Sequence, residues 1–128
     1  SEIKDKLIDR YALDGVPQYI IGDLNTDKKD TTYYCMMLDS LDARDGRVSV
    51  PADVKICTKN AQTWGCSMNE LIPKKYRGQT ELLDYILVRR NGSKLKSLNR
   101  TLAVYRVKEG LRTINLSDHY GIEVRIEN

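Results

Sequence analysis

The order of apolar and polar positions in the first part of the chain predicts a helix followed by a buried strand. Residues 2–13 carry apolar side chains at helical spacing, and this pattern stops before Pro17. Residues 18–21, which are apolar from Tyr19 onward, have the length of a buried strand, and the segment ends at Gly22. The polar residues 23–30 that follow predict a loop at the end of this strand.

The middle of the chain has a less regular pattern. Apolar residues at helical spacing over 31–41 predict a second helix. Residues 42–61 are rich in loop-forming residues, and scattered valines and an isoleucine indicate short strands there. Residues 62–64 predict a further short strand.

The second half of the chain predicts mainly strands. Residues 82–89 have the strongest strand pattern, because apolar residues flank a single acid, Asp84, as in a strand covered on both faces. An Asn-Gly pair predicts a turn after it, residues 97–107 a return strand, and the alternating residues 121–126 a half-buried last strand. The whole pattern predicts an α/β (α+β) fold with a mostly antiparallel or mixed sheet.

Composition limits the class of protein. The 128 residues suffice for a single unit, residues 1–128, and the hydrophobic fraction of 41% with 30% charged residues is typical of a globular chain. No apolar run approaches the ~20 residues of a transmembrane helix, and the charged start lacks the apolar core of a signal peptide. The formal charge of +3 is compatible with a polyanionic partner but does not indicate one. These features leave the compartment unknown.

The three cysteines, Cys35, Cys57 and Cys66, do not have the spacing of a metal-binding cluster. Their odd number favours free thiols. A disulfide between Cys57 and Cys66 is the alternative in an oxidising compartment.

The first candidate for chemistry lies at the end of the strand predicted at 18–21. Asp23 and Asn25 alternate with Leu24, so the two polar side chains would share one side while Leu24 turns inward. A carboxylate and a carboxamide in this arrangement can hold a water and a phosphoryl oxygen together. The same sequence is equally typical of a turn in which the aspartate side chain accepts a backbone hydrogen bond.

Two further segments place polar groups at strand positions. Asp84 is an acid within an apolar strand, and a buried carboxylate needs a partner: an arginine, a backbone donor, a metal or a histidine that it orients. His119, the only histidine, follows Asp118 and precedes the last strand. A lone histidine is more often structural than catalytic, but its acidic neighbour and its place before a strand favour a functional role.

The segments GDLN, LDYIL and SDHYG occur in this order and together resemble the C-terminal signature of the endonuclease/exonuclease/phosphatase (DNase I-like) superfamily. Residues 33–41, the Thr63-Trp64 pair and Asn69 are similar to its neutral and bacterial sphingomyelinase branch. The resemblance covers nearly the whole chain. It implies half of a four-layer α/β/β/α sandwich with helices flanking the sheets.

The resemblance implies a role for each candidate site residue. Asp23 resembles the aspartate that positions or activates the attacking water, and Asn25 the asparagine that donates to the phosphoryl oxygens. Asp84 resembles the acid that holds the histidine, and His119 the residue that acts as general base or neutralises phosphate charge. Asp118 resembles a residue that assists the metal site or orients its neighbour. Asp23, Asn25 and Asp118 are thus the metal-site candidates, and oxygen ligands suit Mg²⁺, Mn²⁺ or Ca²⁺. The implied reaction is metal-dependent phosphodiester hydrolysis.

The chain departs from the superfamily pattern in one large respect. The family's first strand ending in asparagine, its metal-binding glutamate and its other histidine have no counterpart before Tyr19. The resemblance therefore implies a C-terminal portion that is inactive alone and has one uncovered sheet face. Because uncovered apolar surface favours association by ~25 cal/mol per Å², we expect self-association or a companion chain that supplies the missing half.

Two substrate classes and one non-enzymatic function remain as alternatives. Membrane-acting sphingomyelinases carry an aromatic-tipped hairpin before the SDH segment, whereas Tyr105 is the only aromatic residue in 104–115. A nuclease therefore stays open beside a sphingomyelinase-like enzyme, and so does a non-catalytic scaffold that binds nucleic acid or protein. A group of basic residues is either an ordinary solvated face or a track for phosphates. This group consists of Arg89, Arg90, Lys94, Lys96, Arg100, Arg106, Lys108 and Arg112.

Overall fold

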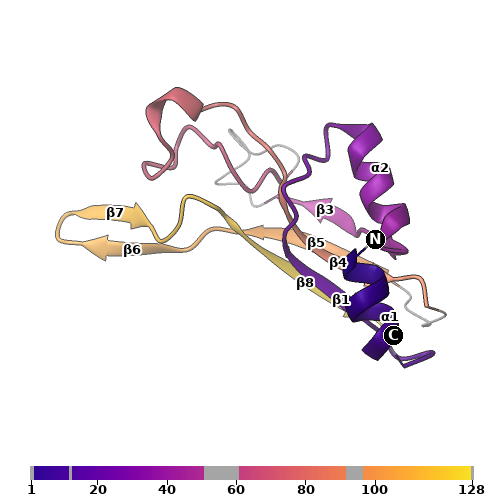
Figure 1. The fold of residues 1–128 in the computed structure, drawn as a ribbon. Coiled ribbons are helices and arrows are strands. Elements are labelled where there is room, and N and C mark those ends of the chain that lie inside the picture. The colour runs from indigo at the N-terminus through magenta and orange to yellow at the C-terminus, as the bar shows by residue number, and fades with distance from the viewer. Residues whose placement is uncertain (1, 12, 51–60, 92–96, 128) are drawn as a thin grey trace.

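The computed structural model describes residues 2–11, 13–50, 61–91 and 97–127 (Figure 1). In chain order the elements are the π-helical turn η1 (Lys4–Ile8), α1 (Asp9–Tyr11), β1 (Tyr19–Asp23), α2 (Thr31–Ser40), β2 (Ala43–Arg44), β3 (Arg47–Ser49), the 3-10 turn η3 (Lys74–Tyr76), β4 (Asp84–Arg89), β5 (Ser97–Ala103), β6 (Arg106–Glu109), β7 (Arg112–Asn115) and β8 (Gly121–Glu127). Within these residues no helix is long and apolar enough to cross a membrane.

The described strands form two three-stranded sheets and a hairpin. β4 lies between β1 and β2, and both neighbours run antiparallel to it. In the second sheet β5 lies between β3, which is parallel to it, and β8, which is antiparallel. The β6–β7 hairpin extends away from both sheets (Figure 1). The sheets are therefore mixed and mainly antiparallel, as the sequence predicts.

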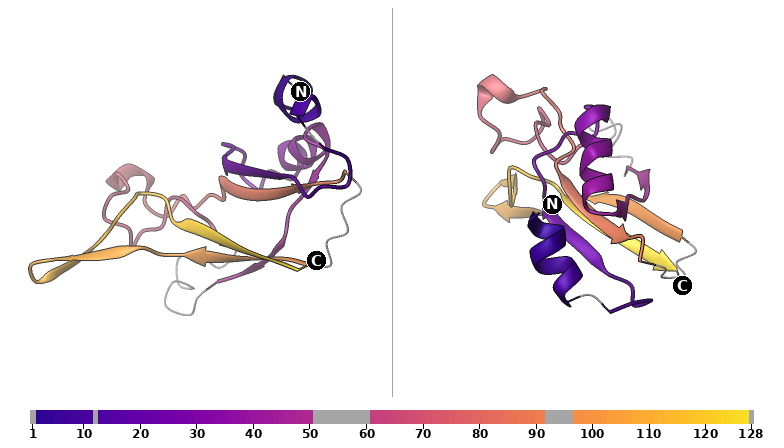
Figure 2. Two further views of the ribbon diagram at one scale, coloured as in Figure 1. Left: turned by 90° about the horizontal axis from the view of Figure 1, so that it is seen from below. Right: turned by 45° about the vertical axis from the view of Figure 1, so that its right-hand side comes forward.

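Helices and sheets lie in three successive layers. α2 and the N-terminal helix lie on one side of the sheet of β1 and β4, and the sheet of β5 and β8 lies on the other (Figure 2, left). On the helix side the core contains Leu41, Tyr85 and Leu87. On the other side Val88 and Leu98 form the core between the two sheets. This arrangement is the α/β/β part of the predicted four-layer sandwich.

A buried ion-pair cluster stabilises the chain where it passes from β2 to β3. The Asp45 carboxylate, 4% exposed, accepts from Arg100 Nη1 at 3.1 Å and from Lys28 Nζ at 2.8 Å. It also accepts from the Tyr34 hydroxyl at 2.9 Å. Burial, and then the nearby carboxylate, raise the pKa of Tyr34. Since removal of one partner would leave a buried charge, this cluster fixes the connection between the sheets.

The predicted helices and the strands at 18–21, 82–89 and 121–126 are confirmed, with ends shifted by a few residues. The strand predicted at 62–64 is wrong, because only an isolated bridge between Trp64 and Glu81 forms there. The return strand predicted at 97–107 is divided into β5 and β6, and β5 pairs with β8 rather than with β4. The strand indications at 51–60 and the glycine of the predicted Asn-Gly turn lie outside the described residues.

The cysteine prediction needs a correction. Cys66 is buried and disulfide-bonded, so the free thiol predicted there is wrong. Cys35 is a free, exposed thiol, as predicted. Cys57 lies outside the described residues. The odd number of cysteines required only that one thiol remain, and Cys35 is such a thiol.

Two of the basic residues that the sequence assigned either to a solvated face or to a phosphate track lie in the interior. Arg100 is fully buried, and Arg89 is 7% exposed and pairs with Asp9 and Asp42. Both guanidinium groups are thus engaged in structural ion pairs. Lys94 and Lys96 lie outside the described residues.

Candidate active site

The ends of β1 and β4 bring two acids together. Antiparallel pairing aligns Asp23 with Asp84, so both side chains project from the same face of the sheet. Asp23 is exposed and Asp84 is half-buried. Directly opposed like charges destabilise a strand pair, so this position favours a cation or a proton-carrying group beside the two carboxylates.

His119 lies next to this pair of acids. Its Nδ1 is 2.8 Å from Oδ2 of Asp84. One ligand atom from each of Asp23, Asp84 and His119 lies within 4.8 Å of the other two, and we call these three residues the acid–histidine group. Because Nδ1 is engaged by the carboxylate, Nε2 is the ring nitrogen that can exchange a proton with water or a substrate. The arrangement suits proton transfer beside a cation.

Thr63 holds the backbone beneath Asp84. Its fully buried Oγ1 accepts from the N–H groups of Leu83 and Asp84, at 3.1 and 3.2 Å. β2 pairs only with the far end of β4, so this hydroxyl replaces a neighbouring strand at the near end. The Thr63 carbonyl also accepts from the N–H of Tyr120 at 2.7 Å. Thr63 therefore links the start of β4 to the residue that follows His119.

The turn that carries His119 is ordered by local hydrogen bonds. The Ser117 hydroxyl accepts from the His119 N–H at 3.1 Å. The buried side chain of Asn69 donates to the Ser117 carbonyl at 2.9 Å. Asp118 in this turn is exposed and is not among the three closely spaced ligand groups.

The segment after β1 is the Asx turn that the sequence left open as an alternative. The Asn25 N–H donates to Oδ1 of Asp23 at 2.8 Å, and Asn25 has a φ of 49°. Asparagine tolerates this left-handed conformation better than most residues. Leu24 packs against the core, as predicted. The turn leaves Asp23 in the acid–histidine group and Asn25 exposed beside it.

A pocket of about 280 Å³ adjoins His119. The Tyr105 hydroxyl at this pocket donates to Glu123 at 3.2 Å, and this bond raises the pKa of Tyr105. The lining residues are Asp84, Tyr105, Leu116, Ser117, His119, Tyr120 and Gly121. Sequence reasoning missed Thr63, Ser117 and Tyr120 as site residues, since common hydroxyl residues at such positions carry no distinctive spacing.

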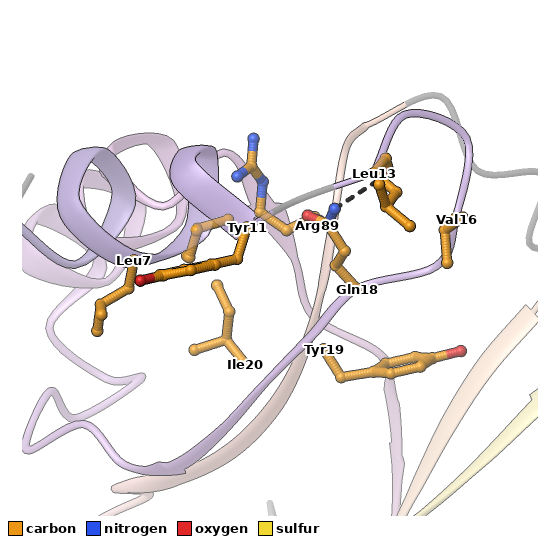
Figure 3. A pocket seen from close by; sticks show the side chains of 9 residues that line it. Leu7, Tyr11, Leu13, Val16, Gln18, Tyr19, Ile20 and Arg89 are labelled. Carbon is orange, nitrogen blue, oxygen red and sulfur yellow. Dashed lines mark hydrogen bonds between the residues drawn. The ribbon is translucent and has the colours of Figure 1, made fainter.

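A second pocket, of about 300 Å³, lies between the N-terminal helix and β1 (Figure 3). Ile20 lines this pocket. It precedes Asp23 by three positions in β1, so the two side chains point to opposite faces of the strand. Its other lining residues are Leu7, Ile8, Tyr11, Leu13, Val16, Gln18, Tyr19 and Arg89. Leu7, Tyr11 and Leu13 are 58%, 71% and 69% exposed. This pocket is an apolar hollow separate from the acid–histidine group.

No protein-family model matches the sequence, and neither does any curated protein. The structure matches that of a beta toxin mutant from Staphylococcus aureus with bound magnesium ions. The two share 25% sequence identity, with a TM-score of 0.72 over 99% of this chain and 43% of that one. Sphingomyelinase C from Streptomyces griseocarneus matches with 21% identity and a TM-score of 0.59, over 99% of this chain and 43% of the enzyme. An endonuclease/exonuclease/phosphatase family protein from Leptotrichia buccalis C-1013-b matches with 22% identity and a TM-score of 0.57, over 96% and 41% of the two chains.

The chain thus spans less than half the length of each of these structures. The order of its three motifs and its strand arrangement agree with the same fold. The resemblance stated from the sequence is confirmed: the chain has the fold of the endonuclease/exonuclease/phosphatase superfamily, with an extent that fits its C-terminal half.

Proposed function

We propose that the protein to which this chain belongs hydrolyses phosphodiesters with the help of a divalent cation. Its catalytic residues in this half are Asp23, Asn25, Asp84, Asp118 and His119. The observation that carries the proposal is the 2.8 Å contact between His119 and Asp84, with Asp23 in the same group. These residues come from three separate parts of the chain, and a common location is what phosphoryl transfer chemistry requires.

His119 is the proton-transfer group in this proposal. Asp84 holds the imidazole through Nδ1, fixes the ring direction and offsets the positive charge that the ring acquires with a second proton. Nε2 is then the atom that takes a proton from the attacking water or stabilises the phosphate. Asn25 donates to a phosphoryl oxygen, and Asp118 assists at the edge of the site.

The donor set fits a divalent cation. Asp23 and Asp84 bring two carboxylates close together, and oxygen ligands suit Mg²⁺ or Mn²⁺. Asp23, with Asn25 and Asp118, would hold the ion, which when bound would stabilise negative charge on the phosphoryl oxygens. The magnesium ions in the related beta toxin structure support Mg²⁺ as the first choice.

A sphingomyelin-like lipid is the favoured substrate class. One of the similar structures is a sphingomyelinase C. Two arginines of the alternative phosphate track, Arg89 and Arg100, are engaged in buried ion pairs. A nucleic acid is the second candidate, because Arg106, Lys108 and Arg112 of the hairpin are exposed.

Residues 1–128 act in this proposal as a C-terminal unit that needs a missing half. β1 is an edge strand in the described sheet, and Ile21, on the same face as Asp23, is 70% exposed. Tyr19 on that face is 40% exposed. An upstream segment, a companion chain or a second copy would cover this surface and complete the metal site.

The test uses the intact protein with Mg²⁺, sphingomyelin vesicles and plasmid DNA. Asp23→Ala and His119→Ala should each lower turnover by about 10²–10⁴-fold, because each removes a positioned acid or base. Asp14→Ala, an exposed acid in the loop before β1, is the matched control and should retain activity.

Three results would contradict parts of this proposal. Hydrolysis of neither substrate with Mg²⁺, Mn²⁺ or Ca²⁺ would refute the enzyme. Full activity in both alanine variants would show that the site lies elsewhere. Salt-dependent binding of DNA without turnover would support the non-catalytic scaffold instead.

A further inference from the structure

Glu70 is an acidic residue outside the proposed catalytic group that holds the chain just before the His119 turn. Its Oε2 accepts from Asn115 Nδ2 at 2.7 Å, and its Oε1 accepts from the Asn115 backbone N–H at 2.5 Å. Asn115 is 5% exposed, and its Oδ1 accepts from Arg106 Nε at 3.4 Å. Hydrogen bonds to an ionised carboxylate are about twice as strong as neutral ones, so Asn115 is firmly placed.

Asn69 makes a second attachment one residue earlier. Its side chain is almost fully buried, and Nδ2 donates to the carbonyl of Ser117 at 2.9 Å. The same nitrogen is 3.4 Å from the carbonyl of Asp118. Oδ1 accepts from the Leu71 N–H at 3.1 Å, so both ends of this amide are used.

The segment that carries these two side chains is itself fixed. Arg77 Nε donates to the Ile72 carbonyl, and Arg77 Nη2 donates to the Glu70 carbonyl, both at 2.9 Å. The Asn69 N–H donates to the carbonyl of the disulfide-bonded Cys66 at 3.0 Å. A rigid support of this kind can hold an exposed turn in one position.

We infer that Thr63, Asn69 and Glu70 form a clamp that holds the 115–120 turn and so sets the position of His119 against Asp84. Glu70 and Asn69 are positioning residues, because they act through the backbone of the turn. The catalytic consequence rests on the proposed function, whereas the geometric one does not. Leu116, Ser117 and Asp118 are exposed, so side-chain packing does not fix this middle part of the turn. A misplacement of about 1 Å in a catalytic group lowers the rate by roughly 100-fold.

Glu70→Gln tests the clamp, because an amide nitrogen would then face one of the two Asn115 donors. His119 is the only histidine of these 128 residues, and in the intact protein its imidazole NMR signals are identified as those absent from His119→Ala. We expect these signals to move towards those of Asp84→Asn. We also expect kcat of the intact protein to fall by about 10–100-fold, with KM within about twofold. Glu109→Gln, which removes the same charge from exposed β6, is the matched control and should change neither.

Rescue separates positioning from a general loss of stability. In the double variant E70Q/N115D the amide nitrogen at position 70 donates to the carboxylate at position 115. The amide oxygen at position 70 accepts from the backbone N–H of position 115. Both bonds between residues 70 and 115 are thereby restored, and only the side-chain bond has its donor and acceptor exchanged. We expect the imidazole signals and kcat to return towards the original values.

The outcomes distinguish the two proposals. Unchanged imidazole signals in Glu70→Gln, or no rescue by the double variant, would overturn the clamp. A shifted imidazole in a protein that hydrolyses no phosphodiester would keep the clamp and refute the proposed function. Should Glu70→Gln not fold, amide exchange in the unaltered protein decides. The clamp requires the Asn115 and His119 N–H groups to be as protected as those of β8, and fast exchange there would overturn it.

Discussion

Replacement of Thr63 by valine tests how the fold supports the start of β4. Valine keeps the shape of threonine but lacks the hydroxyl that accepts from the Leu83 and Asp84 N–H groups. Thr63 is fully buried, so water cannot easily take over this role. The substitution therefore removes one acceptor and leaves two backbone donors without a partner, while it creates no cavity.

The expected loss of stability follows from these two bonds. A hydrogen bond contributes about 0.5–1.5 kcal/mol, and a buried donor left without a partner costs about 1–3 kcal/mol. Because Leu83 and Asp84 are only half-buried, we expect about 2–4 kcal/mol in total. For a chain of 128 residues this corresponds to a fall in Tm of about 7–15 °C.

Urea unfolding and calorimetry measure this loss, and NMR of His119 reports the consequence for the site. Thr63→Ser keeps the hydroxyl and is the control, with an expected loss of about 1 kcal/mol for the missing methyl group. Equal losses in the serine and valine variants would refute the reasoning, because stability would then depend on the methyl group and not on the acceptor.

Two further predictions concern pH and association. The pKa of Glu70 is lowered by its own backbone N–H and then by the Asn115 donors, so its contribution to stability is complete above the unfolded-state pKa and disappears as pH falls through the folded-state pKa. We expect the difference in unfolding free energy between the original protein and Glu70→Gln to shrink between about pH 6 and about pH 3 in urea titrations, and a constant difference would contradict this role. Ile21→Glu places a charge on the uncovered face of β1 and should reduce self-association in sedimentation experiments without lowering Tm. Association of equal strength in this variant would exclude that face as the interface.

Apolar periodicity was enough to predict the helices and strands that have one face packed against the core. In α2, Tyr34, Met37 and Leu38 pack against the core. In β4, the fully buried residues Tyr85 and Leu87 occupy alternate positions. The same reasoning failed where pairing depends on distant residues. The strand pattern at 97–107 does not reveal that β5 pairs with β8 and not with β4, because apolar spacing alone does not specify the partner strand.

The candidate site was predictable in its chemical groups but not in its support. The order of the three motifs indicated that Asp23, Asp84 and His119 belong together, and the structure brings their ligand atoms within 4.8 Å. The contacts of Thr63 and Asn69 were not predictable, since both residues lie in an irregular segment and bond to backbone groups 20 and 48 residues away. Hydrogen bonds of this kind follow the tertiary fold and leave no periodic pattern in the sequence.

The hydrogen bond between Asp84 and His119 joins positions 35 residues apart and has a consequence for folding. In the folded chain this bond depends on the pairing of β1 with β4 and of β5 with β8, so the acid–histidine group requires non-local contacts of the kind that limit folding rates. An unfinished or partly unfolded chain therefore has no assembled reactive centre. If the intact protein binds a divalent ion as proposed, its affinity for the ion would rise together with the native population, and ion binding would then report on folding.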